Sequence, residues 1–287
     1  MLTAERVTAP LTYHGEGPFW DAANSRMFCV DMLAGEIVAL GSSGEAERYD
    51  VPSSVVTVIR RRAAGGFAIA SERGLLCSNE ALTRFELIAD VTVDTALRTN
   101  DGGCDALGAF VIGTMAYDER IGAGTVYRIT PDGRVTELLT PVSISNGVQW
   151  SADGTRAYYI DTPTRRVDVF NVDPDTGAWW GRRIHIELSK ASGYPDGLAI
   201  DEEDGLWIAL WGGGAVAHYD AQGRLVQTIQ VPDVSQTSAC AFGGDDRTVL
   251  YITTSRQGLH CDQEPYAGAI YAVNTASRGA PVREFAG

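Results

Sequence analysis

The chain alternates apolar and polar residues in short runs, separated by polar turns that are rich in glycine, aspartate and proline. An alternation with a period of two residues is typical of β-strands that bury one face. Helical spacing of apolar residues is hard to find anywhere along the chain. The hydrophobic pattern therefore predicts an all-β protein.

This strand pattern recurs along the chain as a unit of roughly 40–50 residues. Each unit holds an inner segment, a polar turn, an alternating strand, a second turn and a further strand. The six copies begin near Glu16, Gly65, Cys104, Asn146, Asp196 and Ala241. Repeats of this length, with four strands each, are typical of propeller blades. We therefore predict a six-bladed β-propeller with four-stranded antiparallel blades, in a single domain over residues 1–287, rather than a non-repeating sandwich or barrel.

Equivalent positions in successive blades form a ring around the propeller axis, because the innermost strands line the central channel. One position of the inner segment carries an oxygen-bearing side chain in most copies. The residues there are Glu16, Thr57 or Val58, Asn100, Asn146, Asp196 and Ser238 or its neighbour. Glu-Gly-Pro, Asn-Gly and Asp-Gly are also ordinary turn sequences. Their recurrence at one place in the repeat favours a site on the axis instead.

Two carboxylates and several carboxamide oxygens that converge on one point suit a hard cation. We expect one divalent cation, with Ca²⁺ ahead of Mg²⁺, Mn²⁺, Fe²⁺ and Zn²⁺. The chain holds 4 histidines, none of them in an HExxH or HxH motif. A histidine-dominated zinc site is therefore not expected.

The overall charge and the cysteines narrow the class of protein further. A net charge of −14 argues against a nucleic-acid partner, because phosphate binding needs a basic face. No apolar stretch is long enough to cross a membrane, and residues 1–6 lack the features of a signal peptide. Cys29, Cys77, Cys104, Cys240 and Cys261 have no CxxC spacing and are expected to be reduced, mostly buried thiols. We expect a cytoplasmic protein with no nucleic-acid or membrane partner.

Several specific motifs follow one another along nearly the whole chain. They are Gly15-Glu-Gly-Pro-Phe-Trp20, Arg98-Thr-Asn-Asp-Gly102, Ile112-Gly-Thr-Met115, Ile144-Ser-Asn-Gly147, Tyr158-Tyr-Ile-Asp161, Pro195-Asp-Gly197, Leu206-Trp-Ile-Ala209 and Cys240-Ala-Phe-Gly-Gly244. In this order they resemble the senescence-marker-protein/gluconolactonase/luciferin-regenerating-enzyme family. The resemblance implies a six-bladed propeller with one divalent metal that opens a small sugar lactone to the aldonic acid.

The resemblance also assigns roles to individual residues. It places the metal ligands on Glu16, Asn146 and Asp196, which the repeat alignment had selected independently. It places substrate contacts on Arg98 and Asn100. A further acidic substrate contact falls on Asp118, where some relatives carry the longer glutamate.

Lactone hydrolysis needs a polarised carbonyl, an activated water and stabilisation of the developing oxyanion. We expect Asp196 to act as the general base, because a carboxylate beside the metal can take the proton from that water. Arg98 and Asn100 are expected to hold the sugar against the metal. No G-x-S-x-G motif supports a serine hydrolase.

Two other functions are compatible with this scaffold. A metal that polarises a lactone also polarises a phosphotriester or another ester, so organophosphate hydrolysis is one alternative. A non-enzymatic propeller that binds calcium or a protein partner is the other, since a fold does not determine a function. Converging acids argue against a pure interaction module, which has no need for them.

Overall fold

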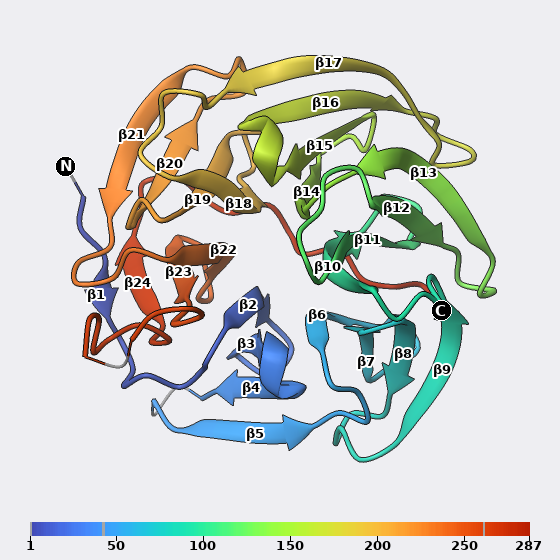
Figure 1. The fold of residues 1–287 in the computed structure, drawn as a ribbon, viewed down its shortest axis with the longest axis horizontal. Helices are drawn as coiled ribbons and strands as arrows, with labels where there is room; N and C mark the ends of the chain where they lie inside the picture. Colours follow the sequence, from blue (N-terminus) through green and yellow to red (C-terminus); the bar gives the residue numbers. More distant parts are fainter. Residues whose placement is uncertain (1, 42–43, 261) are drawn as a thin grey trace.

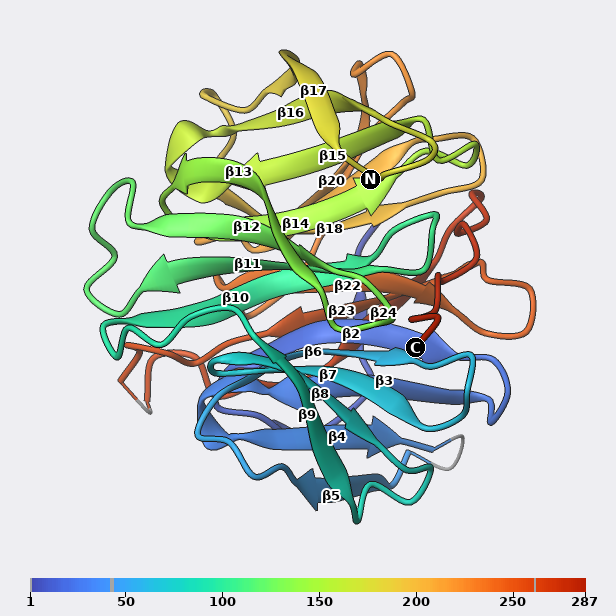
Figure 2. The same ribbon diagram turned by 90° about the vertical axis from the view of Figure 1, so that its right-hand side faces the viewer.

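The computed structural model describes residues 2–41, 44–260 and 262–287 of the chain. These residues form six four-stranded antiparallel sheets around a central axis (Figure 1), and Figure 2 shows the same ring edge-on. The predicted six-bladed β-propeller is confirmed. Besides strands, the described residues form two short 3-10 helices, η1 (Met32–Ala34) and η2 (Thr162–Thr164). The described residues contain no helix that is long and apolar enough to span a membrane.

Five blades follow the order of the chain from the axis outward. Blade 1 holds β2 (Gly15–Asp21), β3 (Arg26–Asp31), β4 (Glu36–Leu40) and β5 (Ala46–Asp50). Blade 2 holds β6 (Val56–Arg61), β7 (Phe67–Ser71), β8 (Gly74–Ser78) and β9 (Phe85–Asp90). Blade 3 holds β10 (Leu97–Cys104), β11 (Phe110–Ala116), β12 (Gly124–Ile129) and β13 (Val135–Val142). Blade 4 holds β14 (Ser145–Trp150), β15 (Arg156–Asp161), β16 (Arg166–Val172) and β17 (Trp179–Glu187). Blade 5 holds β18 (Tyr194–Ile200), β19 (Leu206–Trp211), β20 (Ala215–Tyr219) and β21 (Leu225–Gln230).

The sixth blade combines the two ends of the chain. It holds β22 (Thr237–Gly243), β23 (Val249–Thr254) and β24 (Tyr271–Asn274), and its outermost strand is β1 (Glu5–Arg6). Strand β1 pairs with β24 in antiparallel register, Glu5 opposite Ala272 (Figure 1). The first strand of the chain therefore completes the last blade and closes the ring without a peptide bond across the seam.

Apolar side chains fill the space between the faces of neighbouring blades. One buried cluster joins blades 1 and 2, where Phe19, Phe28 and Phe67 pack together with ring centroids 5.2–6.5 Å apart. The inner strands β2, β6, β10, β14, β18 and β22 contact one another around the full circle. This packing fixes the relative positions of side chains that stand far apart in the sequence.

A carboxyl-terminal tail, drawn in red in Figure 1, crosses the ring at the end of the channel where the inner strands finish. The backbone N–H of Ala280 donates to the carbonyl of Ile200 at 3.0 Å, and the N–H of Ala286 donates to Gly108 at 2.9 Å. Phe285 is fully buried and packs edge-on against Phe110. The N–H of Phe285 also donates to the carbonyl of Arg61 in blade 2 at 2.9 Å, so the tail links blade 5 with blade 2 on the opposite side of the ring.

Candidate metal and substrate site

Every inner strand carries a β-bulge close to its predicted ring position. The pairing register shifts between Glu16 and Phe19, Val56 and Val58, Thr99 and Asp101, Asn146 and Val148, Pro195 and Leu198, and Thr237 and Ala239. A bulge takes a side chain out of the regular alternation of a strand and turns it in a new direction. The same local distortion is therefore repeated six times around the axis, at the level of the predicted ring.

Four of the six ring positions line one cavity of about 460 Å³. These residues are Glu16, Asn100, Asn146 and Asp196, each about 5–6% exposed. The two remaining positions serve the scaffold. Thr57 lies 3.2 Å from the hydroxyl of Thr99, and the hydroxyl of Ser238 donates to the carbonyl of Gly15. The structure thus brings together the three predicted metal ligands and one predicted substrate contact.

The two carboxylates of the cavity lack a partner of opposite charge. Among the described residues, neither Glu16 nor Asp196 forms an ion pair within 4.0 Å, although Glu16 accepts a hydrogen bond from the backbone of Gly17. Burial, followed by the charges of neighbouring acids, raises the pKa of both carboxyl groups. The charge of Asp101 contributes to this repulsion. Buried acids without a counter-charge are costly, and a divalent cation between them would remove the cost.

The carboxamide of Asn146 is held in one orientation. Its Nδ2 donates to the hydroxyl of Thr162 at 2.7 Å, and that hydroxyl donates to the carbonyl of Pro195 at 2.8 Å. Its Oδ1 accepts a hydrogen bond of 3.1 Å from Nδ2 of Asn100. The anchored Nδ2 leaves the oxygen of Asn146 facing the cavity, which is the end of the amide that a cation requires.

Glu16, Asp196 and Asn146 together offer two carboxylates and one amide oxygen as possible metal donors. In the described part of the chain, no three His, Cys, Asp or Glu side chains gather as a metal site. A cation held by Glu16 and Asp196 would therefore need the amide oxygen of Asn146 as a third ligand. An all-oxygen set with open positions suits a hard cation better than a thiophilic one.

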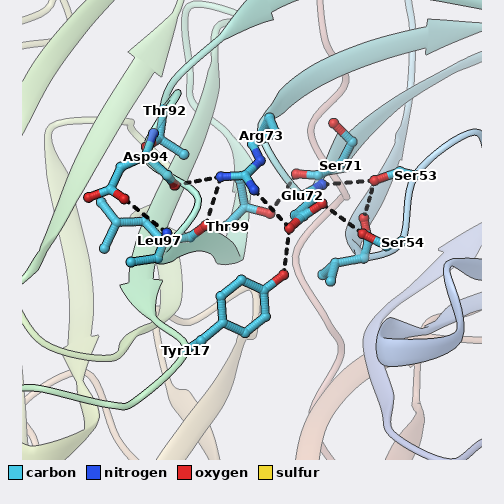
Figure 3. Close-up of polar contacts among 12 residues, drawn as sticks. Ser53, Ser54, Ser71, Glu72, Arg73, Thr92, Asp94, Leu97, Thr99 and Tyr117 are labelled. Atoms are coloured by element: carbon cyan, nitrogen blue, oxygen red, sulfur yellow. Dashed lines mark hydrogen bonds and ion pairs between the residues drawn. The ribbon is translucent and has the colours of Figure 1, made fainter.

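Arg98 lies beside this donor set in the same cavity. Its guanidinium donates to Oδ1 of Asn100 at 2.7 Å and to the carbonyl of Thr99 at 2.9 Å. The side chain is buried, with the ring of Tyr117 5.9 Å from its Cζ. The hydroxyl of Tyr117 donates to Glu72 of the neighbouring blade at 2.6 Å (Figure 3). The predicted substrate residues Arg98 and Asn100 thus form one hydrogen-bonded unit. Tyr117, which lies beside Arg98, connects this unit to Glu72 of blade 2.

Asp118 does not reach the cavity. Its side chain is 64% exposed and forms an ion pair with Arg120 at 2.9 Å. The next residue, Glu119, lines the cavity, and its backbone has a φ of +56°, in the left-handed region. Such a conformation is unusual for a residue other than glycine, and the charge of Glu119 acts on Arg98.

Two buried aspartates support the inner strands in the same way. Asp31, at the end of β3, accepts hydrogen bonds from the backbone N–H groups of Tyr13 and His14 at 3.0 Å. Asp161, at the end of β15, accepts equivalent bonds from the residues two and three positions before Asn146, at 2.9–3.1 Å. The same device therefore fixes the backbone just before two of the three expected ligands.

The glycines that follow the expected ligands Asn146 and Asp196 allow neighbouring inner strands to approach closely. A Cβ on Gly147 would lie 2.4 Å from Cβ of Leu198, and one on Gly197 would lie 2.4 Å from Cβ of Ala239. Asn-Gly and Asp-Gly therefore occur here inside strands and do not form turns. The interpretation of these motifs as part of an axial site agrees with their positions.

The cysteines take no part in this site. Cys29, Cys77, Cys104 and Cys240 are buried free thiols, as predicted, and Cys261 lies outside the described residues. Burial raises the pKa of Cys29 and Cys240 to about 12. Thiols with such pKa values are poor nucleophiles at neutral pH.

Comparison with known proteins agrees with the motifs. Residues 14–256 match the family described as "SMP-30/Gluconolactonase/LRE-like region". The chain belongs to this family. Regucalcin of Gallus gallus is 33% identical over 285 residues, with 95% of each chain covered. The Bacillus subtilis protein named "Putative sugar lactone lactonase YvrE" is 30% identical over 280 residues, also with 95% of each chain covered. The crystal structure of a calcium-binding protein, regucalcin, from Agrobacterium tumefaciens has a TM-score of 0.93 at 29% identity, covering 99% of this chain and 97% of that one.

Several cavity residues of this SMP-30/gluconolactonase member were not predicted from the sequence. They are His14, Met115, Glu119, Ile144, Thr162, Pro163, Tyr194, Trp211, Gln257 and Gly258. Most of them belong to loops or strand ends at the open side of the cavity. His14 is buried among them, and burial followed by the charge of Arg98 lowers its pKa to about 3. The sequence offered one signal for them, the aspartates Asp31 and Asp161 that end β3 and β15. These aspartates mark the backbone segments that they hold, which include His14 and Ile144.

Proposed function

We propose that the protein is a metal-dependent lactonase that opens a sugar lactone to its aldonic acid. Glu16, Asn146 and Asp196 hold one divalent cation, with Ca²⁺ ahead of Zn²⁺, Mg²⁺, Mn²⁺ and Fe²⁺. The observation that carries the proposal is the pair of buried, uncompensated carboxylates that share a cavity with an oriented carboxamide oxygen. The family description and the name of the Bacillus subtilis relative support the lactone as substrate.

In this proposal, the cation, Asp196 and Glu16 have different roles in lactone hydrolysis. A cation bound there supplies Lewis-acid polarisation of the lactone carbonyl and lowers the pKa of water. Asp196, which has no hydrogen-bond partner among the described residues, takes the proton from the attacking water. The ester C–O bond then breaks, and the proton passes to the ring oxygen that becomes the new hydroxyl. The carboxylate of Glu16 lines the same cavity and would contribute a second negative charge to balance the charge of the cation.

The unit of Arg98 and Asn100 positions the substrate. Nδ2 of Asn100 already donates to the carbonyl of Ser145 and to Asn146, and Oδ1 accepts from Arg98. Asn100 is therefore rigid. The remaining N–H groups of Arg98 form no hydrogen bond with another described residue, and both Arg98 and Asn100 line the cavity. Fixed donors of this kind lower the entropic cost of holding a lactone in a reactive orientation.

A panel of substrates tests the function. Metal-stripped protein is mixed with one cation at a time, and acid release from gluconolactone, xylonolactone, galactonolactone and a phosphotriester is followed. We expect lactone turnover only with a cation, and none in Asp196→Asn. Asp220→Asn, in an exposed turn between β20 and β21, is the matched control and should behave as wild type. A faster phosphotriester reaction would favour the organophosphate alternative, and no turnover with any cation would favour the non-enzymatic one.

The acidic substrate contact is tested separately. The family resemblance assigns it to Asp118, whereas Glu119 lines the cavity. We propose Glu119 for this role, so Glu119→Gln should raise KM about 10-fold, the effect of one lost charge-assisted hydrogen bond. Asp118→Asn should leave KM unchanged. The reverse result would return the role to Asp118.

A further inference from the structure

His14 lies two residues before Glu16 and forms part of the same cavity. Its backbone is held on both sides, because its N–H donates to Asp31 at 3.0 Å and its carbonyl accepts from Met32 at 2.8 Å. His14 as a whole residue is 6% exposed. Trp211 packs edge-on against the imidazole, with ring centroids 5.6 Å apart. The position and plane of the imidazole are therefore fixed before any ligand arrives.

A buried hydroxyl determines which ring nitrogen carries the proton. Oγ of Ser255 lies 2.7 Å from Nδ1 of His14, and the same oxygen accepts the backbone N–H of Gln257 at 3.0 Å. Ser255 is fully buried, so its O–H needs an acceptor. Among the hydrogen bonds of the described residues, Nδ1 of His14 is the acceptor in reach. A neutral imidazole that accepts at Nδ1 carries its hydrogen on Nε2.

The Nε2–H group has no protein partner in the described part of the chain. Nε2 is not fully enclosed by protein atoms, so we place it at the surface of the cavity that His14 lines. A fixed donor on the wall of a substrate cavity is left unsatisfied unless a ligand oxygen or a water accepts from it. The wall around His14 is built by Trp211 and Gln257, whereas Arg98 and Asn100 reach the cavity from a different blade.

We infer that His14 donates from Nε2 to a hydroxyl oxygen of the bound lactone and so selects polyhydroxylated lactones over plain ones. This inference rests on the proposed lactonase function and adds to it a residue that recognises the hydroxyl groups of the sugar. A site that offers a buried donor to a substrate hydroxyl discriminates strongly against analogues that lack this hydroxyl, because the donor then stays unpaired. Donors on two walls suit a sugar ring with hydroxyl groups on more than one side.

The experiment compares two lactones with the same six-membered ring. Gluconolactone carries hydroxyl groups, and δ-valerolactone carries none. In His14→Leu, kcat/KM for gluconolactone should fall about 10- to 100-fold, whereas kcat/KM for δ-valerolactone should change less than about 3-fold. His14→Gln places an amide N–H near the position of Nε2 and should restore most of the preference. Equal losses on both lactones, or no loss on gluconolactone, would overturn the inference.

Two further measurements separate this inference from the proposed function. Calorimetric binding of 1,5-anhydroglucitol, a hydroxylated ring without a carbonyl, should weaken about 10-fold in His14→Leu even if no lactone is opened. Ser255→Ala frees the tautomer of His14 and should give a smaller loss of the same preference, which keeps the test valid if His14→Leu does not fold. Unchanged binding in His14→Leu, or an unchanged preference for gluconolactone over δ-valerolactone in Ser255→Ala, would contradict the role of His14 but not the lactonase proposal. Absence of turnover in the wild type would contradict the lactonase proposal alone.

Discussion

The hydroxyl of Thr162 controls which end of the Asn146 amide faces the proposed cation. Thr162→Val keeps the shape of the side chain but removes the acceptor of Nδ2, which lies 2.7 Å away, and the donor to Pro195. The amide is then free to rotate and to present its NH₂ group to the cavity. Loss of such an outer partner typically lowers metal affinity about 10- to 100-fold, which corresponds to about 1.4–2.7 kcal/mol.

The assay is a calorimetric titration of metal-stripped protein with Ca²⁺ or Mn²⁺. Thr164→Val is the matched control, because Thr164 lies in the same short helix η2 and its hydroxyl donates to the carbonyl of Asp161 at 2.7 Å, away from Asn146. We expect Thr162→Val to bind the cation 10- to 100-fold more weakly than Thr164→Val. Equal affinities in the two variants would refute the claim that an oriented Asn146 is a ligand.

Three further predictions concern the scaffold. Phe285→Ala should lower the free energy of unfolding by about 3–5 kcal/mol in urea, because Phe285 is fully buried; an effect as small as that of the 40% exposed Val282→Ala would contradict a tail that ties the blades. Gly147→Ala should cost about 1–3 kcal/mol, since its Cβ would overlap Leu198, and a neutral result would show that the strands can separate. Burial alone would raise the pKa of Asp201, but hydrogen bonds from His218, Trp207 and the backbone outweigh it and lower the pKa. A group whose pKa is lower in the folded state than its unfolded value of about 4 stabilises the fold above that pH, and this stabilisation is lost as the pH falls. Asp201→Asn should therefore be less stable than the wild type at pH 7, and the difference in stability should narrow below pH 4. A difference that widens on acidification would contradict this prediction.

The sequence predicted the inner strands of the clearest blades well, because these strands are almost fully buried and carry motifs that recur at equivalent positions of the repeat. Strands β2, β14 and β18 begin within two residues of the positions expected for the clearest copies. The outer strands were harder to detect. Strand β17 is mostly exposed, so few of its residues need to be apolar, and β1 has only two residues, whose role depends on meeting β24 at the far end of the chain.

The same reasoning explains which site residues could be predicted. Glu16, Asn100, Asn146 and Asp196 occupy equivalent positions of a repeat, so ring geometry places them together without knowledge of any loop. Glu119 depends on one backbone angle in an irregular turn, and a different conformation there would present another carboxylate. Loop conformations of this kind follow from tertiary contacts rather than from an apolar pattern.

The most direct test of the account is an anomalous diffraction measurement on crystals grown with Mn²⁺. The account predicts a single strong peak on the propeller axis, about 2.0–2.6 Å from carboxylate oxygens of Glu16 and Asp196 and from Oδ1 of Asn146. The peak should disappear in crystals of Asp196→Asn. No peak at that point in the wild type, or a peak bound by other residues, would contradict the claim that these three side chains hold the ion.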